Sequence, residues 1–124
     1  MAETFFSMFT PKEIAQISAS GTRVHLPEGW SPIWEDTPPD KAYIILSGTV
    51  SVRHKGDEIA QLGPGDIIGE AAIVKKSLRT ASIVSLTPLD LIHLSKEVLE
   101  RLDVEMPSFH RALEQTAADR FSAE

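Results

Sequence analysis

Hydrophobic and polar residues alternate with a period of two through the middle of the chain, as they do in half-buried strands. In residues 23–26 and 49–53, valine and leucine alternate with polar residues. Residues 43–46 form a short apolar run, and residues 58–62, 80–86 and 89–94 have the composition of further strands. Glycine and proline turns separate these segments. Several short strands at close spacing predict a β-sandwich or barrel.

A helix is expected before the strands. Thr10 followed by Pro11 is typical of an N-cap and the first helical position. Ile14 and Ile17 then form the apolar side of a short helix, and Gly21 ends it.

Helices are expected again after the strands. Ser95 is a candidate N-cap for one helix, and Pro107 begins the last one. The last helix carries Phe109, Leu113 and Phe121, which either pack against the barrel or form a lid or a dimer face. Helix, strands and helices in this order predict an α+β domain whose body is a β jelly roll.

Composition narrows the class of protein. The 124 residues hold 12 Lys+Arg and 18 Asp+Glu, a net charge of 12 − 18 = −6, which argues against a nucleic-acid-binding face. The absence of cysteine excludes disulfides, iron–sulfur clusters, thiolate zinc sites and a cysteine nucleophile. Apolar runs are too short to cross a membrane, and the first residues do not resemble a signal peptide, so a cytoplasmic protein is expected.

One segment, residues 69–81, interrupts the strand pattern and carries the candidate chemistry. Small residues after Gly69 allow a short helix whose first N–H groups suit a phosphate. The guanidinium of Arg79 can bind two phosphate oxygens at once. Glu70 would repel a simple anion, but it could accept a hydrogen bond from a sugar hydroxyl beside the phosphate. The segment therefore indicates a nucleotide, with a structural Glu70–Arg79 ion pair as the alternative.

Three stretches, residues 43–50, 62–72 and 79–81, together resemble the cyclic nucleotide-binding domain family. This family includes the sensor domain of the catabolite activator protein and the regulatory domains of cyclic-nucleotide-dependent kinases and channels. The resemblance extends from about Phe9 to about Leu113. It implies an eight-stranded jelly roll (a double-stranded β-helix) with an N-terminal helix and C-terminal helices, in one domain over residues 1–124. The step of nine residues from Glu70 to Arg79 (79 − 70 = 9) is common among nucleotide-binding members.

The resemblance also implies a role for each site residue. Glu70 matches the carboxylate that binds the ribose 2′-hydroxyl, and Arg79 matches the arginine that binds the phosphate. Residues 71 and 72 match the turn whose amides reach the cyclic phosphate. Thr80 matches a position that contacts the phosphate or guanine. The expected ligand-binding residues are Gly69, Glu70, Ala71, Ala72, Arg79 and Thr80.

The sequence departs from the family pattern at several positions. Ile68 replaces an aromatic residue, Leu78 replaces a proline or serine, and Asp36-Thr37 stands where Gly-Asp is usual. The long helix and helix-turn-helix domain of the related transcription factors do not follow Phe121, so DNA binding by this chain is not expected.

These observations predict a binding module, not an enzyme, with a 3′,5′-cyclic nucleotide as its ligand and no cofactor or metal. Cyclic AMP is favoured over cyclic GMP. The C-terminal helices, or a protein partner or second copy bound to them, would transmit the signal, and neither nucleic acid nor membrane is an expected partner.

Two other functions stay open. The first is a degenerate jelly-roll interaction or assembly module that binds no cyclic nucleotide. The second, and the least favoured of the three, is a metal-dependent cupin-like enzyme that uses some of the four histidines. Trp30 and Trp34 are expected to anchor the core or a loop.

Overall fold

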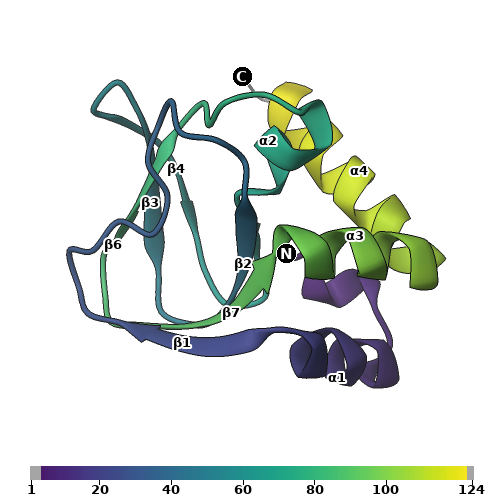
Figure 1. The fold of residues 1–124 in the computed structure, drawn as a ribbon. Coiled ribbons are helices and arrows are strands. Elements are labelled where there is room, and N and C mark those ends of the chain that lie inside the picture. Colours follow the sequence, from purple (N-terminus) through teal and green to yellow (C-terminus); the bar gives the residue numbers. More distant parts are fainter. Residues whose placement is uncertain (1–3, 123–124) are drawn as a thin grey trace.

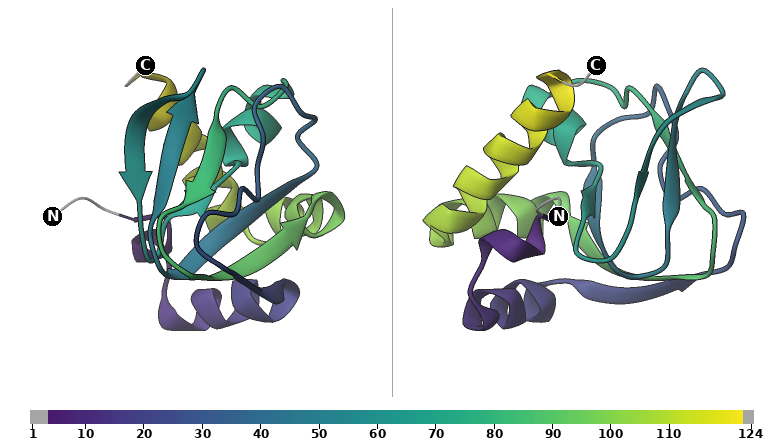
Figure 2. Two further views of the ribbon diagram at one scale, coloured as in Figure 1. Left: turned by 90° about the vertical axis from the view of Figure 1, so that its left-hand side faces the viewer. Right: turned by 180° about the vertical axis from the view of Figure 1, so that it is seen from behind.

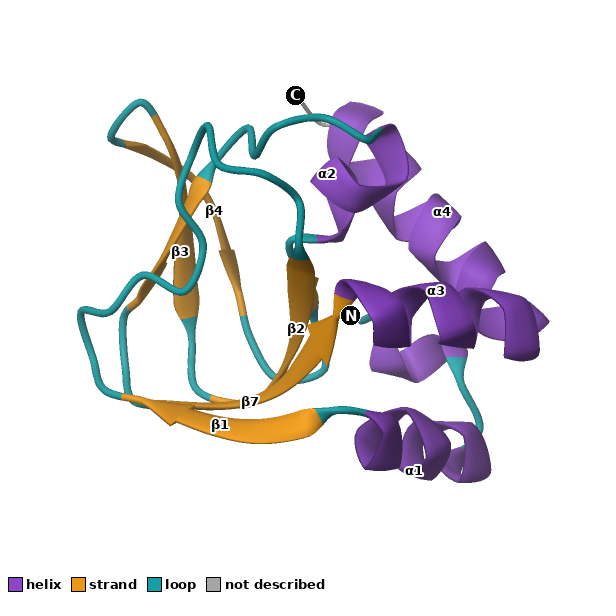
Figure 3. Ribbon diagram, viewed as in Figure 1, coloured by secondary structure: helices purple, strands orange, loops and turns teal. Residues whose placement is uncertain are grey.

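The strands and the helices occupy different sides of the molecule (Figures 1 and 3). The computed structural model describes residues 4–122, and their side chains as far as Asp119. The helical elements are η1 (Phe6–Met8), α1 (Pro11–Ser20), α2 (Glu70–Lys75), α3 (Lys96–Glu105) and α4 (Pro107–Ser122). The strands are β1 (Thr22–Leu26), β2 (Lys41–Ser47), β3 (Val50–His54), β4 (Asp57–Leu62), β5 (Ile67–Ile68), β6 (Ser82–Ser85) and β7 (Leu89–Ser95).

The strands form two antiparallel sheets. One sheet has the strand order β1-β7-β2-β5, and the other has the order β4-β3-β6. The jelly-roll body and its flanking helices confirm the predicted fold class.

The predicted number of eight strands was wrong, because the described residues form seven. The segment between β1 and β2 holds four prolines, at positions 27, 32, 38 and 39. Proline has no N–H to donate to a ladder, so a regular strand cannot form there. The segment keeps one isolated bridge, in which Ile33 pairs with Ile83 of β6.

Strand β2 lies between two hydrophobic cores, one on the side of the helices and one between the two sheets. Ala42 and Ile44 face the helices, whereas Tyr43 and Ile45 face the space between the sheets, and all four are buried. Burial on both faces accounts for the continuous apolar run in this strand, since a half-buried strand would alternate.

The helical core is built around three phenylalanines. The rings of Phe5 and Phe9 lie 5.1 Å apart, and those of Phe5 and Phe109 lie 5.7 Å apart, both edge to face. Phe109 and Leu113 are buried in this cluster, which confirms that they pack against the rest of the fold. The side chain of Phe121 lies outside the described residues.

The predicted helix starts are confirmed. Thr10 accepts a hydrogen bond from the backbone N–H of Glu13 (3.2 Å), and Glu13 accepts one from the N–H of Thr10 (2.9 Å), a complete capping box. Ser95 caps α3 by accepting from the N–H of Val98 (3.2 Å), and α4 begins at Pro107. Near the top of Figure 1, and from behind in Figure 2, α4 lies beside α2.

Candidate functional site

Gly69 turns the chain from strand β5 into helix α2. Its φ is +90°, in a region that favours glycine. A Cβ atom here would lie 2.7 Å from Cδ1 of Ile33 and 2.8 Å from Nη1 of Arg79. Both the backbone angle and the close packing therefore require glycine at the start of the candidate segment.

A cavity of about 550 Å³ lies between α2 and the hairpin of β3 and β4. All six predicted site residues line it, namely Gly69, Glu70, Ala71, Ala72, Arg79 and Thr80. The other lining residues, most of them apolar, are Ile33, Val52, His54, Ile59, Ala60, Leu62, Ala81 and Ile83. A cavity of this size, largely apolar with a few polar groups, is typical of small-molecule sites.

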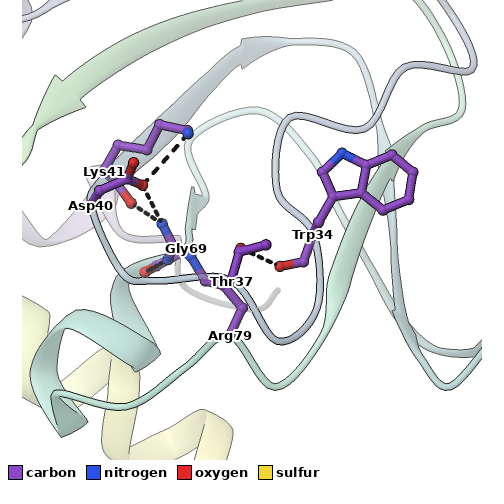
Figure 4. A network of polar contacts seen from close by, with 6 residues as sticks. All are labelled: Trp34, Thr37, Asp40, Lys41, Gly69 and Arg79. Carbon is purple, nitrogen blue, oxygen red and sulfur yellow. Dashed lines mark hydrogen bonds and ion pairs between the residues drawn. The ribbon is translucent and has the colours of Figure 1, made fainter.

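The guanidinium of Arg79 is buried and held by backbone carbonyl groups. It donates to the carbonyl oxygens of Gly69 and of Lys41, the second at 2.5 Å (Figure 4). The carboxylate of Asp40 lies 3.8 Å from Nη2 of Arg79. These contacts tie the loop that follows α2 to the start of β2 and fix the position of the guanidinium at the cavity wall.

The electrostatics of Arg79 reflect this burial. Removal from water lowers the pKa of Arg79 from its ordinary value, and the negative charges of Asp40 and Glu70 act in the opposite direction. Glu70 is completely buried and lines the same cavity. The structure thus brings the predicted carboxylate and guanidinium to one cavity, close enough for their charges to interact.

Sequence reasoning missed two parts of this site. Asp40 and the carbonyl of Lys41 contact Arg79 from a segment 38 residues away, and no local pattern connects the two. His54 lines the cavity from the end of β3, but in the sequence it was one of four scattered histidines. Register with β6, where Arg53 pairs with Ser82, places His54 next to the Arg79–Thr80 segment.

The two tryptophans do not anchor the core. Trp30 and Trp34 are 59% and 63% exposed, and neither lines the large cavity. In Figure 4 the indole of Trp34 points away from Arg79.

The histidines have separate partners. His25 contacts Asp90, His54 contacts Glu35, and His110 contacts Asp103. Within the described part of the chain, no three histidine, aspartate or glutamate side chains come together as a metal site requires. The structure therefore offers no support for the cupin-like alternative among these residues.

Comparison with known proteins decides the family. The model of the family described as "Cyclic nucleotide-binding domain" matches residues 23–103. The chain belongs to this family. Its members are regulatory sensor domains, and the glycine-glutamate to arginine segment lies inside the matched range.

Three relatives illustrate the match. The chain is 26% identical to a CRP-like cAMP-activated global transcriptional regulator of Mycobacterium tuberculosis, over 93% of this chain and 54% of the relative. It is 36% identical to human potassium/sodium hyperpolarization-activated cyclic nucleotide-gated channel 4, over 71% of this chain and 7% of the channel. The Thermus thermophilus catabolite activator protein shares the fold, with a TM-score of 0.84 and 24% identity over 95% of this chain and 58% of that protein.

These relatives are longer proteins. The chain spans about half the length of the Mycobacterium regulator and a small part of the channel. Among the described residues, no helix has both the length and the apolar character that crossing a membrane would need.

Proposed function

We propose that this cyclic nucleotide-binding domain binds a 3′,5′-cyclic nucleotide in the cavity beside α2, with cAMP preferred to cGMP. The observation that carries the proposal is that one buried carboxylate, Glu70, and one buried guanidinium, Arg79, line the same cavity. The protein then acts as a non-enzymatic regulatory sensor. The preference for cAMP draws on the Mycobacterium relative, whose name describes it as cAMP-activated.

Each polar group of the predicted site is assigned to one part of the cyclic nucleotide. Arg79 has five N–H groups, and backbone carbonyls of Gly69 and Lys41 accept from it, which leaves donors for the cyclic phosphate. Glu70 accepts the hydrogen of the ribose 2′-hydroxyl. The backbone of Ala71 and Ala72 borders the phosphate, and Thr80 adds a hydroxyl.

The C-terminal helices provide a route for the signal. Helix α2 packs against α4, and Ile73 and Val74 of α2 contact the helical core that contains Phe109. A ligand that favours one position of α2 shifts the equilibrium between arrangements of α4 by its difference in affinity for them. A protein partner or a second copy bound to these helices would then sense the nucleotide.

Calorimetry on matched arginine variants tests the proposal. Arg79→Ala removes the charge partner of the phosphate and is expected to cost about 2–5 kcal/mol of binding free energy, on the order of 30- to several-thousand-fold in affinity. Arg23→Ala is the control, because Arg23 is exposed on β1 and does not line the cavity. Equal cAMP affinity in wild type and Arg79→Ala would exclude this role of Arg79.

A second function has one observation in its favour. Arg79 already donates to two backbone carbonyls, as a purely structural arginine in a degenerate assembly module would. A thermal-shift series distinguishes the two functions, since a ligand at about 100 times its Kd stabilises the fold by roughly 2.7 kcal/mol. No stabilisation by millimolar cAMP or cGMP would favour the assembly module.

A further inference from the structure

The two sides of the cavity differ in chemistry. The charged groups Glu70 and Arg79 belong to α2 and the loop after it, and the opposite side is formed by β3 and β4. In Figure 1, α2 lies on the side of the helices, and β3 and β4 lie at the far side of the strands. A nucleotide whose phosphate and ribose lie against the charged side must place its base toward β3 and β4.

Strand β4 has the surface that a flat base needs. All its residues are exposed or half-buried, and Ile59 is 51% exposed although it lines the cavity. Four of the lining residues contributed by β3 and β4 are apolar: Val52, Ile59, Ala60 and Leu62. The fifth is His54, the one polar side chain among them, so it is the group on this side that can recognise hydrogen-bonding atoms of a base.

The contacts of His54 fix both its position and its tautomer. Its Nδ1 lies 2.8 Å from the carbonyl oxygen of Thr80 and 3.2 Å from Oε2 of Glu35. Both oxygens are acceptors, so Nδ1 must carry the hydrogen. In the neutral ring Nε2 is then an acceptor, and it has no protein partner among the described residues.

Glu35 in turn holds the ring in place. Its other oxygen, Oε1, accepts from the backbone N–H of Lys55 (2.9 Å), and its own N–H donates to Ser82 (2.8 Å). The imidazole itself contacts Glu35, from the segment before β2, and the carbonyl of Thr80, the residue after Arg79. Both contacts are made by Nδ1, so they leave Nε2 for a ligand.

We propose that His54 determines the base specificity of the cavity, by accepting at Nε2 a hydrogen bond from an N–H group on the base. This inference rests on the proposed function. The ligand class is a purine cyclic nucleotide with an exocyclic amino group or a ring N–H on the edge away from the sugar. Adenine meets this requirement through its amino group, and unsubstituted purine, which has neither an amino group nor a free ring N–H in its riboside, does not.

The test compares cAMP with the cyclic monophosphate of unsubstituted purine riboside, which differs only by lacking the amino group. Calorimetry at pH 8 measures the affinity for each nucleotide. Wild type is expected to prefer cAMP by about 3- to 10-fold, the value of one net hydrogen bond. In His54→Ala and His54→Phe the ratio of affinities is expected to fall to about 1.

His25→Ala is the matched control, because His25 also binds a carboxylate through Nδ1, at 3.0 Å from Asp90, but lies on β1 away from the cavity. It should retain the wild-type ratio. His54→Phe keeps a flat ring if the smaller alanine destabilises the hairpin, and a melting curve of each variant verifies folding.

The outcomes separate the two proposals. A wild-type ratio near 1, or a preference for cAMP that persists in both His54 variants, overturns the role of His54 and leaves nucleotide binding intact. If neither nucleotide binds wild type at all, the proposed function fails and the role of His54 fails with it.

Discussion

The side chain of Arg79 donates a hydrogen bond to the backbone carbonyl of Gly69, ten residues earlier in the chain. Helix α2 and the loop after it lie between these two residues in the sequence. Both residues line the cavity. This contact connects the phosphate-binding candidate to the glycine that turns the backbone, so a change at either residue is expected to affect the other.

Gly69→Ala is expected to lower the free energy of unfolding by about 2–4 kcal/mol, because the new Cβ combines an unfavourable positive φ with overpacking. It would meet Ile33 and Arg79 at 2.7 and 2.8 Å. Denaturant unfolding measures the loss. Gly56→Ala is the control, since Gly56 has nearly the same φ (+87°) but a Cβ there would have no atom within 4 Å. It should lose only about 1 kcal/mol. Equal losses at both positions would show that packing against Arg79 is unimportant.

Glu70→Ala is expected to narrow the preference for cAMP over 2′-deoxy-cAMP by about 10- to 150-fold, because hydrogen bonds to charged groups contribute about 1.5–3 kcal/mol. The ratio of two affinities on one variant cancels any general loss of stability from this buried position. Calorimetric titration with both nucleotides gives the ratio. Glu100→Ala, an exposed glutamate on α3, should keep the wild-type ratio. An unchanged ratio in Glu70→Ala would remove Glu70 from ribose recognition.

His110 is expected to make the contact between α3 and α4 depend on pH. Its Nδ1 lies 2.7 Å from Asp103, and its Nε2 lies 3.2 Å from Glu114. The hydrogen bond and charge of Asp103, with a smaller contribution from Glu114, raise the pKa of His110, and Arg111 acts in the opposite direction. The charged imidazole is therefore more stable in the folded protein than in the unfolded chain.

The sign of the pH effect follows from that raised pKa. The stabilisation is complete below the ordinary histidine pKa of about 6.5 and is lost as the pH rises through the higher folded value. The Tm difference between wild type and His110→Ala should be largest near pH 6 and decline above neutral pH. Asp103→Asn should remove most of this dependence. A Tm difference that grows with pH would contradict the assignment.

Local patterns in the sequence predicted much of the fold, and the pattern of residues 69–81 together with the family resemblance predicted six of the residues that line the cavity. The capping box at Thr10 and Glu13 and the cap at Ser95 act within three residues, so they can be recognised in the chain itself. The separation of nine between Glu70 and Arg79 is likewise local, because one short helix and one loop connect them. The alternation of residues 49–53 correctly predicted strand β3, although Ser51 is as fully buried as Val50.

Other features depend on partners that are distant in the sequence. The carbonyl of Lys41 reaches Arg79 across 38 residues, and His54 reaches the carbonyl of Thr80 across 26. The proline-rich segment between β1 and β2 keeps one isolated bridge to β6, and its Trp30 and Trp34 are exposed because this part of it crosses the surface. Most helices and strands and the Glu70–Arg79 pair could thus be predicted from local patterns in the chain. The contributions of Asp40, Lys41 and His54 to the site could not, because they depend on sheet register and burial, which involve the whole chain.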